Sequence, residues 1–216
     1  MANKVPSAGP SQETDSGAST SRAEQKRESI LRAAREVFLN QGFASASMDL
    51  VAAEAGVSKV TIYSKFGSKQ ELFSAIVDEI CEQILAIEIV IPETMESIRQ
   101  GLTELAVNYA RVLYEPDVLA LVRLAIGENQ ARPDLGRLYN VVGPQRARQG
   151  LVDLFLDLSS RGELRIPDAQ LAADQFLALL QPQRYYVLLD AEALPTTREI
   201  ERVARSGVEV FLTYYA

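Results

Sequence analysis

The chain of 216 residues contains no histidine, no tryptophan and a single cysteine, Cys81. Without histidine, neither a Ser-His-Asp nor a Cys-His nucleophilic site can form, and metal sites with imidazole ligands are excluded. One cysteine excludes an internal disulfide and is typical of a reducing cytoplasm. We interpret Cys81 as a small core residue on a helix.

Nucleotide-binding and membrane-spanning patterns are also missing. Neither GxxxxGK(S/T) nor GxGxxG occurs. The longest apolar run, residues 84–91, is interrupted by Glu88 and is too short to cross a bilayer. Residues 1–22 are small and polar, unlike a secretory signal. The acidic residues are scattered as on solvated helix faces, so we predict a cytoplasmic protein that is no enzyme and uses no cofactor and no metal.

The charges that are present divide the chain into three parts. Residues 1–23 hold two basic and two acidic side chains, whereas residues 24–69 hold seven basic and five acidic ones, a net charge of +2. Residues 70–216 contain 13 arginines, no lysine and 22 acids, a net charge of −9. A small basic segment on an acidic body is expected where only that segment meets a polyanion such as DNA.

Residues 47–73 predict two short helices around a glycine turn, followed by the start of a third. Ser47 can cap the first helix, and Gly56 supplies the left-handed backbone conformation that ends it. Ser58 can then cap a second helix that reaches Phe66. A helix, a tight turn and another helix form the arrangement that sets a recognition helix into the DNA major groove.

The second of these helices has two different faces. Ile62 and Phe66 lie four residues apart and can pack on the first helix. Three lysines and no acid occur between residues 56 and 70, so the segment is locally cationic. The outer face carries side chains suited to phosphates and base edges: Lys59, Val60, Thr61, Tyr63, Ser64 and Lys65.

The segment GVSKVTIYSKFGSKQELF, with GFASASMDLVAAEAGVS before it, resembles the DNA-binding signature of the TetR family of bacterial transcriptional regulators. The resemblance covers residues 24–73. It implies that Lys59, Val60 and Thr61 face bases and nearby phosphates. It also implies that Ser47, Tyr63 and Lys69 contact the phosphate backbone. The DNA-binding set that we predict is Ser47, Ser58, Lys59, Val60, Thr61, Tyr63, Ser64, Lys65 and Lys69.

The whole chain shows helical periodicity, and no strand pattern competes with it. We therefore predict an all-α protein of about nine helices. Its parts are a disordered tail over residues 1–22, a helix-turn-helix domain over 23–69, and a helical regulatory and dimerisation domain over 70–216. A DNA-binding arm is the alternative for the tail. Beyond the first three helices we expect helices from residue 69 onward and over 93–114, 117–130, 144–160, 168–190 with a kink at Gln181-Pro182, and 195–214.

Residues 122–180 resemble the regulatory domain of the AefR-like branch of the TetR family. The resemblance implies a helical body that forms the dimer and holds a cavity for a small molecule. The low histidine count and a mixed aromatic and aliphatic lining suit a moderately hydrophobic organic effector. Arg123 lies in the apolar run LALVRLAIG, where we favour an ion pair with Glu128 or another acid over an anionic ligand. The cavity candidates, each of which fits a plain core position as well, are Tyr109, Leu113, Arg123, Ile126, Phe155, Phe176 and Tyr185.

The last helix carries an apolar stripe with the small residues Ala204 and Gly207, which permit close helix approach. The stripe alone favours an intramolecular core, whereas the family resemblance implies a homodimer built from the last two helices. The predicted dimer residues are Leu171, Leu177, Leu180, Ile200, Val203, Ala204, Gly207, Phe211 and Tyr214.

These observations favour a ligand-responsive repressor that binds a palindromic operator as a homodimer. Its predicted partners are double-stranded DNA, a second copy of the chain and a small organic effector. One alternative is a dimeric regulator with a filled core, controlled by a protein partner or bound to DNA constitutively. Another is a helical enzyme or binding protein that uses the same short helices without contacting DNA.

Overall fold

The computed structural model describes residues 16–85 and 94–216, and all regular structure within these ranges is helical. This confirms the predicted all-α class, with more helices than the nine expected. The elements are α1 (Ser16–Ser45), α2 (Met48–Glu54), α3 (Lys59–Phe66), α4 (Lys69–Leu85), α5 (Met95–Leu113), α6 (Pro116–Glu128), α7 (Pro133–Val142), α8 (Pro144–Ser160), α9 (Ala169–Leu180), α10 (Arg184–Leu189), the 3-10 helix η1 (Ala191–Ala193) and α11 (Thr197–Tyr215).

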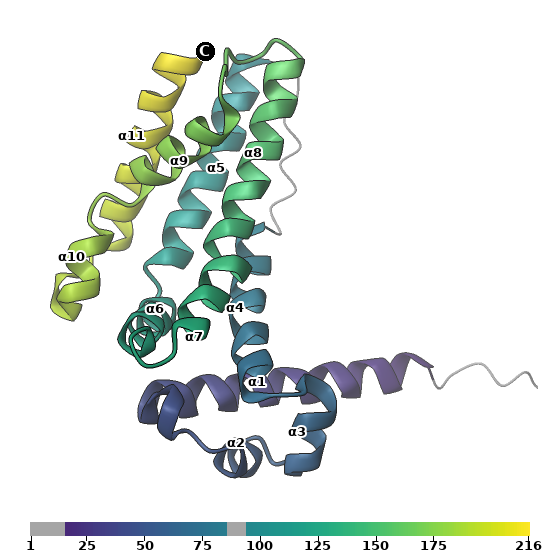
Figure 1. Ribbon diagram of the computed structural model, residues 1–216. Coiled ribbons are helices and arrows are strands. Elements are labelled where there is room, and N and C mark those ends of the chain that lie inside the picture. The colour runs from purple at the N-terminus through teal and green to yellow at the C-terminus, as the bar shows by residue number, and fades with distance from the viewer. Residues whose placement is uncertain (1–15, 86–93) are drawn as a thin grey trace, which may run out of the picture.

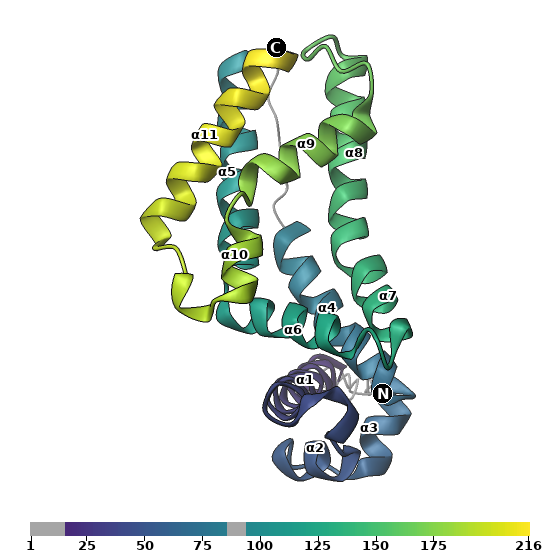
Figure 2. The same ribbon diagram turned by 60° about the vertical axis from the view of Figure 1, so that its left-hand side comes forward.

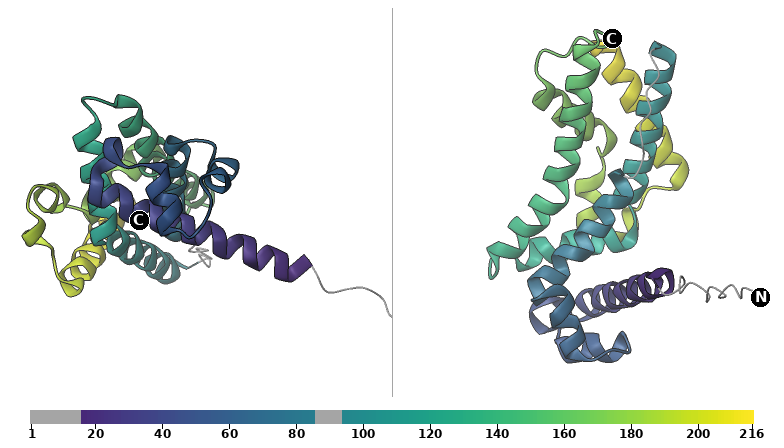
Figure 3. Two further views of the ribbon diagram at one scale, coloured as in Figure 1. Left: turned by 90° about the horizontal axis from the view of Figure 1, so that it is seen from below. Right: turned by 90° about the vertical axis from the view of Figure 1, so that its right-hand side faces the viewer.

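The helices form a small lower unit and a tall upper unit (Figure 1). Helices α1, α2 and α3 make the lower unit, which we call the head, and α5 to α11 make the upper unit, which we call the body. Helix α6 lies across the base of the body and packs on α1 (Figure 2). Helix α4 runs upward from the head into the body (Figure 3).

The start of the chain is more helical than its composition predicts. Residues 16–22 belong to α1, where we predicted disorder. Extending an existing helix adds one hydrogen bond for each residue that is fixed, so a polar segment can continue a helix that the core has already nucleated. The rest of the predicted tail, including the alternative of a DNA-binding arm, falls on residues 1–15 and lies outside the described residues.

The head is organised around a bend in α1 at Gly42. This glycine has a φ of 77°, which interrupts the helical geometry of α1. After the bend, Phe43 turns inward and contacts Phe38 and Phe73 at ring-centroid distances of 5.3 and 5.6 Å. Phe73 belongs to α4, so this aromatic cluster joins the linking helix to the head.

Helix α4 belongs to both units. It packs on α1 and α3 of the head and on α5, α7 and α8 of the body. Its Leu72 and Phe73 are fully buried, and Val77 and Ile80 further along are largely buried. A single rigid helix therefore connects the two cores. The break predicted at Pro92, after α4, lies outside the described residues.

The core of the body is aliphatic with one aromatic cluster. Helix α5 packs along α11, and α9 packs between α8 and α11. Phe155, Phe176 and Phe211 come from α8, α9 and α11. The rings of Phe155 and Phe211 stack at a centroid distance of 4.9 Å, and Phe176 meets both rings edge-to-face at 5.6 and 5.0 Å. All three rings are buried, so this cluster fixes how the three helices sit against each other.

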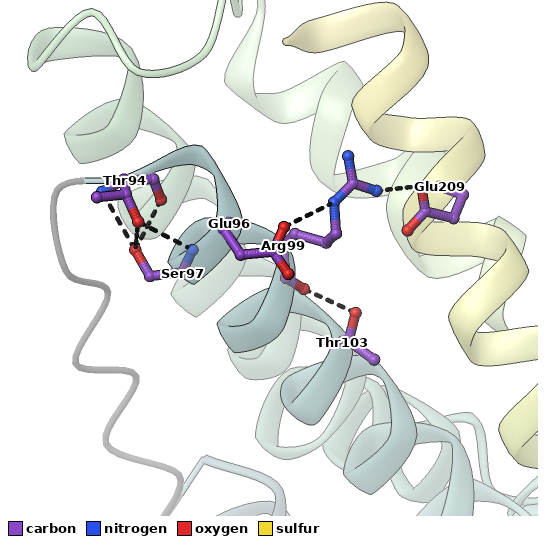
Figure 4. Close-up of polar contacts among 6 residues, drawn as sticks. All are labelled: Thr94, Glu96, Ser97, Arg99, Thr103 and Glu209. Atoms are coloured by element: carbon purple, nitrogen blue, oxygen red, sulfur yellow. Dashed lines mark hydrogen bonds and ion pairs between the residues drawn. The ribbon is translucent and has the colours of Figure 1, made fainter.

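Polar side chains join the start of α5 to α11 (Figure 4). Thr94 and Ser97 form a reciprocal capping box that begins α5. One turn later, Arg99 donates a hydrogen bond to Glu209 of α11 and lies 3.8 Å from Glu96. Exposed ion pairs contribute little stability individually, so apolar contacts dominate this helix pair.

Two parts of the body differ from the sequence prediction. Residues 133–142, which we interpreted as a connection, form α7 with Pro133 at its first position and Leu135 buried. Gly136 in the centre of this segment weakens the helical signal. At Gln181 the backbone leaves helical geometry, with a φ of −135°, so α9 and α10 are separate helices rather than one kinked helix.

Candidate nucleic-acid interface and body cavity

The two short helices of the head are capped as the sequence predicts. The Ser47 hydroxyl accepts a hydrogen bond from the Leu50 amide at 3.1 Å, and the Ser58 hydroxyl accepts one from the Thr61 amide at 3.1 Å. Between them, Gly56 has a φ of 66°, in the left-handed region. These local interactions fix where α3 begins and how it leaves the turn.

Helix α3 presents one face to solvent. Ile62 is fully buried on the inner face, whereas Val60 is 77% exposed and Tyr63 is 42% exposed. Lys59, Ser64 and Lys65 are exposed as well, whereas Thr61 is only partly exposed. Ser47 and Ser58 are also exposed, but both hydroxyls already accept amide hydrogen bonds within the head.

Lys59 is exposed and forms an ion pair with Asp49 of α2, at 2.8 Å from Nζ to Oδ2. The hydrogen bond that Lys59 donates to the Asp49 carboxylate is the main cause that raises the pKa of Lys59. The sequence prediction assigned Lys59 to DNA contact only and did not include this pair. An exposed pair of this kind is weak, so a phosphate can replace the carboxylate.

Lys69 has a different environment from the other lysines of the head. Its Nζ donates to the Ala44 carbonyl at 3.2 Å and lies 4.7 Å from the centre of the Phe43 ring. Burial lowers the pKa of Lys69, and the charge of Arg132 lowers it further. Lys65, by contrast, is exposed, and no ion pair joins it to another residue of the described ranges.

The body encloses a cavity of about 310 Å³. Of the predicted effector contacts, Tyr109 and Leu113 line it. Burial raises the pKa of Tyr109 to about 12, so its hydroxyl stays neutral near pH 7. The lining residues are Val77, Ile80, Cys81, Tyr109, Leu113, Val118, Leu121, Val122, Tyr139, Gly143, Pro144, Ala147, Leu177, Gln181 and Arg184.

The structure places the other five predicted effector contacts elsewhere. Phe155 and Phe176 are fully buried in the aromatic cluster with Phe211, while Ile126 and Tyr185 are 61% and 68% exposed. Helical spacing identified apolar faces but could not distinguish a wall of the cavity from the solid core.

The ion pair predicted for Arg123 is wrong, because this side chain binds backbone carbonyls instead of an acid. Its Nε donates to the Leu188 carbonyl at 3.0 Å, and its Nη2 donates to the Val187 carbonyl at 2.6 Å. These carbonyls belong to the last turn of α10, where helix carbonyls lack helical partners and attract positive charge. Glu128, the expected partner, lies near Arg132 instead, at 3.7 Å.

An apolar groove of about 820 Å³ runs between α9 and α11. It is lined by Val203, Gly207 and Tyr214 from the predicted dimer set and by Val210, which the prediction missed. Val210 and Tyr214 are 54% and 76% exposed.

Most of the other predicted dimer residues are buried within their own body and do not reach the accessible surface. Ile200, Ala204 and Leu180 are buried in their own body, and Phe211, although it borders the groove, is only 2% exposed. Leu177 borders the cavity, whereas Leu171 is 51% exposed. The stripe chosen from the sequence follows the inner face of α11, because that face is the most continuously apolar. The accessible apolar face lies beside it.

Family models match both units of the chain. Residues 30–76 match the model described as bacterial regulatory proteins, tetR family. Residues 100–216 match the AefR-like transcriptional repressor C-terminal domain. Among the described residues, no helix is both long and apolar enough to cross a bilayer.

Curated relatives resemble this chain over a short segment. The transcriptional activator FasR of Mycolicibacterium smegmatis is 38% identical over 63 residues, which is 29% of this chain and 29% of that protein. The transcriptional regulator UidR of Escherichia coli is 42% identical over 64 residues, 30% of this chain and 33% of that protein. The matches therefore span a third or less of these relatives.

Solved structures resemble nearly the whole chain. A TetR family transcriptional regulator from Pseudomonas syringae pv. tomato is 31% identical with a TM-score of 0.67, and the match covers 88% of this chain and 96% of that one. The flavonoid-responsive regulator FrrA is 29% identical with a TM-score of 0.70, covering 89% and 97% of the two chains. All of these relatives are described as regulators and none as an enzyme.

Proposed function

Because the chain belongs to the TetR family of DNA-binding transcriptional regulators, we propose that it is a ligand-responsive repressor acting as a homodimer. In this proposal, residues 23–69 bind the operator and residues 70–216 dimerise and hold the effector. The observation that carries the proposal is the exposed face of α3, where Val60 is 77% and Tyr63 is 42% exposed beside two exposed lysines. That face offers phosphate donors and one apolar contact for a thymine methyl group.

The size of a DNA site and the groove between α9 and α11 support the proposed homodimer. One α3 helix reads only a few base pairs, and two-fold symmetric proteins place two recognition helices roughly 34–36 Å apart in successive major grooves. Val210 and Tyr214 leave exposed apolar surface along the groove. A second copy of the same helices can cover this surface in an isologous four-helix contact.

Response to a small molecule is supported by the cavity of about 310 Å³ in the body. Its walls include Val77 and Ile80 of α4, the helix that also carries Phe73 into the core of the head. A ligand that prefers one position of α4 would therefore bias the position of α3. A filled core, as in the alternative without an effector, would leave no such space. The relative FrrA is described as flavonoid-responsive, which is consistent with an organic effector.

The decisive experiment is nuclease footprinting of the purified protein on the DNA that flanks its own gene. We expect protection of an inverted repeat, with two half-sites one helical turn or a multiple of it apart. Lys59→Ala with Tyr63→Phe should abolish the footprint, whereas Lys26→Ala on the exposed side of α1 should leave it intact. A footprint unchanged by the double substitution would contradict the role of α3.

Transcription assays then distinguish repression from activation, since the relative FasR is described as an activator. A reporter driven by the footprinted promoter should become more active when the gene is deleted. Lower reporter activity in the deletion strain would instead identify an activator that uses the same DNA-binding surface.

A further inference from the structure

The cavity wall contains one charged side chain. Of the fifteen residues that line it, Arg184 alone carries a formal charge at neutral pH, and no aspartate or glutamate is among them. Arg184 lies at the start of α10, directly after the break at Gln181-Pro182. Nothing in the sequence around it, QPQRYY, indicates that it turns inward.

The guanidinium of Arg184 is half-buried and has no anionic partner. Its Nη1 donates to the amide oxygen of Gln181 at 3.0 Å. No ion pair joins it to an acid within residues 16–85 and 94–216. Removing a cation from water is costly unless it is paired, and a guanidinium pairs best with a planar carboxylate, which it can bind through two parallel hydrogen bonds.

Two hydroxyl groups extend this polar end of the cavity. Tyr109 and Tyr139 both line it. Burial raises the pKa of each hydroxyl, and the nearby Arg184 guanidinium acts in the opposite direction. Both side chains are therefore neutral hydrogen-bond donors near pH 7, so they add no negative charge that would compete for Arg184.

The rest of the wall is apolar. It consists of one proline, one glycine, one cysteine and eight aliphatic side chains, contributed by α4, α5, α6, α8 and α9. A space of about 310 Å³ lies at the small end of the usual range for ligand pockets. The occupant must therefore combine a compact apolar body with a polar group at one end.

We infer that the cavity takes a small amphipathic organic anion, a monocarboxylate with an aromatic or branched aliphatic body, whose carboxylate is held by Arg184. Tyr109 and Tyr139 donate hydrogen bonds at the same end, and the aliphatic wall covers the apolar body. The inference rests on the proposed function, in which this cavity is the effector site. It adds the chemical class of the effector and names the residue that selects it.

Three probes with the same ring system test the charge preference: 2-naphthoate, the neutral 2-naphthamide and the cationic 2-naphthylmethylammonium. Binding is measured by titration calorimetry on the full chain. Occupancy of the cavity is measured by the rate at which a thiol reagent modifies Cys81, which lines the cavity and is the single cysteine of the chain. We expect 2-naphthoate to bind roughly tenfold more tightly than 2-naphthamide and to protect Cys81, with the cation binding least.

Three variants assign the preference to one side chain. Arg184→Gln should bring the carboxylate and the carboxamide to within about twofold of each other, and Arg184→Lys should restore part of the difference because it keeps the charge. Arg198→Gln removes the same charge from the exposed first turn of α11, so it should retain the full preference. Circular dichroism and thermal unfolding verify that each variant folds.

The outcomes separate this inference from the proposed function. The inference is overturned if wild type binds the three probes equally or binds none at millimolar concentration, or if Arg184→Gln keeps the preference. In the last case the role of Arg184 is limited to its hydrogen bond with Gln181. If 2-naphthamide releases the footprinted DNA as well as 2-naphthoate does, the cavity is still the effector site, but the inference that the effector is an anion is wrong. If 2-naphthoate binds and protects Cys81 without changing DNA affinity, the cavity chemistry stands and ligand-controlled repression is wrong.

Discussion

The carboxylate of Glu128, the last residue of α6, accepts a hydrogen bond from the backbone amide of Ala44 at 3.1 Å. Ala44 follows the Gly42 bend of α1, so this contact joins the base of the body to the head. The other side of the same turn is held by Lys69, whose Nζ donates to the Ala44 carbonyl at 3.2 Å. The backbone amide and carbonyl of Ala44 therefore bind Glu128 of the body and Lys69 of α4, respectively.

Replacing Glu128 should loosen this junction. We expect Glu128→Ala to lower the free energy of unfolding by about 1 kcal/mol, because a hydrogen bond to a charged acceptor is lost. Glu128→Gln should cost less, since its amide oxygen can still accept. Denaturant unfolding at a fixed protein concentration measures both. Glu36→Ala, an exposed glutamate of α1, is the control and should change stability by less than about 0.5 kcal/mol. Equal stabilities of Glu128→Ala and wild type would show that the contact contributes nothing.

The lysines of the proposed DNA-binding surface should differ in how they affect the salt dependence of binding. Lys65→Ala should lower the slope of log affinity against log salt by about one, because it removes one phosphate contact. We expect Lys69→Ala to lower the slope by a similar amount and also to reduce stability, since Lys69 binds the Ala44 carbonyl and the Phe43 ring. Mobility-shift titrations on operator and unrelated DNA at several salt concentrations measure the slopes. An unchanged slope in Lys69→Ala would mean that its ammonium stays on the Ala44 carbonyl in the complex.

The head could be predicted from the sequence in detail because its signals are local. Ser47 and Ser58 bond to amides three residues away, and Gly56 needs its positive φ for the turn itself. Each of these interactions depends on neighbours within a few positions, which a single sequence displays directly. The exposure of the α3 face follows in turn from the position of Ile62.

Most of the residues that line the cavity could not be predicted, because helices far apart in the chain form it. Arg123 binds carbonyls 64 and 65 residues away, and its apolar neighbours gave no indication that α10 would lie there. Arg184 enters the cavity because the chain breaks after α9, which sets the direction of α10. The rotation of α11 about its axis is likewise fixed by α5 and α9 together, so the predicted stripe mixes buried residues such as Ala204 with residues of the groove such as Val203 and Tyr214.

Stability should depend on alkaline pH through Tyr109. Burial raises its pKa from 10.0 to about 12, so the folded state retains a proton that the unfolded state loses above pH 10. The stabilisation is fully present below pH 10 and is lost as the pH rises from about 10 to 12. A shift of this size corresponds to roughly 2–3 kcal/mol across that range. Denaturant unfolding of wild type and Tyr109→Phe between pH 8 and 11.5 should show a smaller decline in the variant. Parallel curves would contradict the shifted pKa.

Two helical glycines should respond in opposite directions to the same substitution. A Cβ at Gly207 would lie 3.2 Å from the Leu179 carbonyl oxygen and from Leu180 Cδ2, whereas a Cβ at Gly127 meets no atom within 4 Å. Gly127→Ala should therefore stabilise the protein by about 0.5–1 kcal/mol through helix propensity. In Gly207→Ala the added methyl group would crowd Leu179 and Leu180, which outweighs the helix propensity. This variant should therefore destabilise the protein by up to about 2 kcal/mol. Thermal unfolding of both variants makes the comparison, and a more stable Gly207→Ala would show that α9 and α11 can separate without cost.

Dimerisation through the α9–α11 groove should be sensitive to a charge placed on its exposed face. Val210 is 54% exposed on this face, and Val141 is 51% exposed on α7, away from the groove. A buried unpaired charge costs several kcal/mol at an interface, so Val210→Arg should convert the proposed dimer to a monomer at micromolar concentration. Sedimentation velocity measures the mass of each species. Val141→Arg adds the same charge at nearly equal exposure and should remain dimeric.

Because each monomer carries only one α3, Val210→Arg should also lose the inverted-repeat footprint while retaining weak, salt-sensitive binding to any duplex. A Val210→Arg protein that stays dimeric would place the contact between copies on another surface of the body.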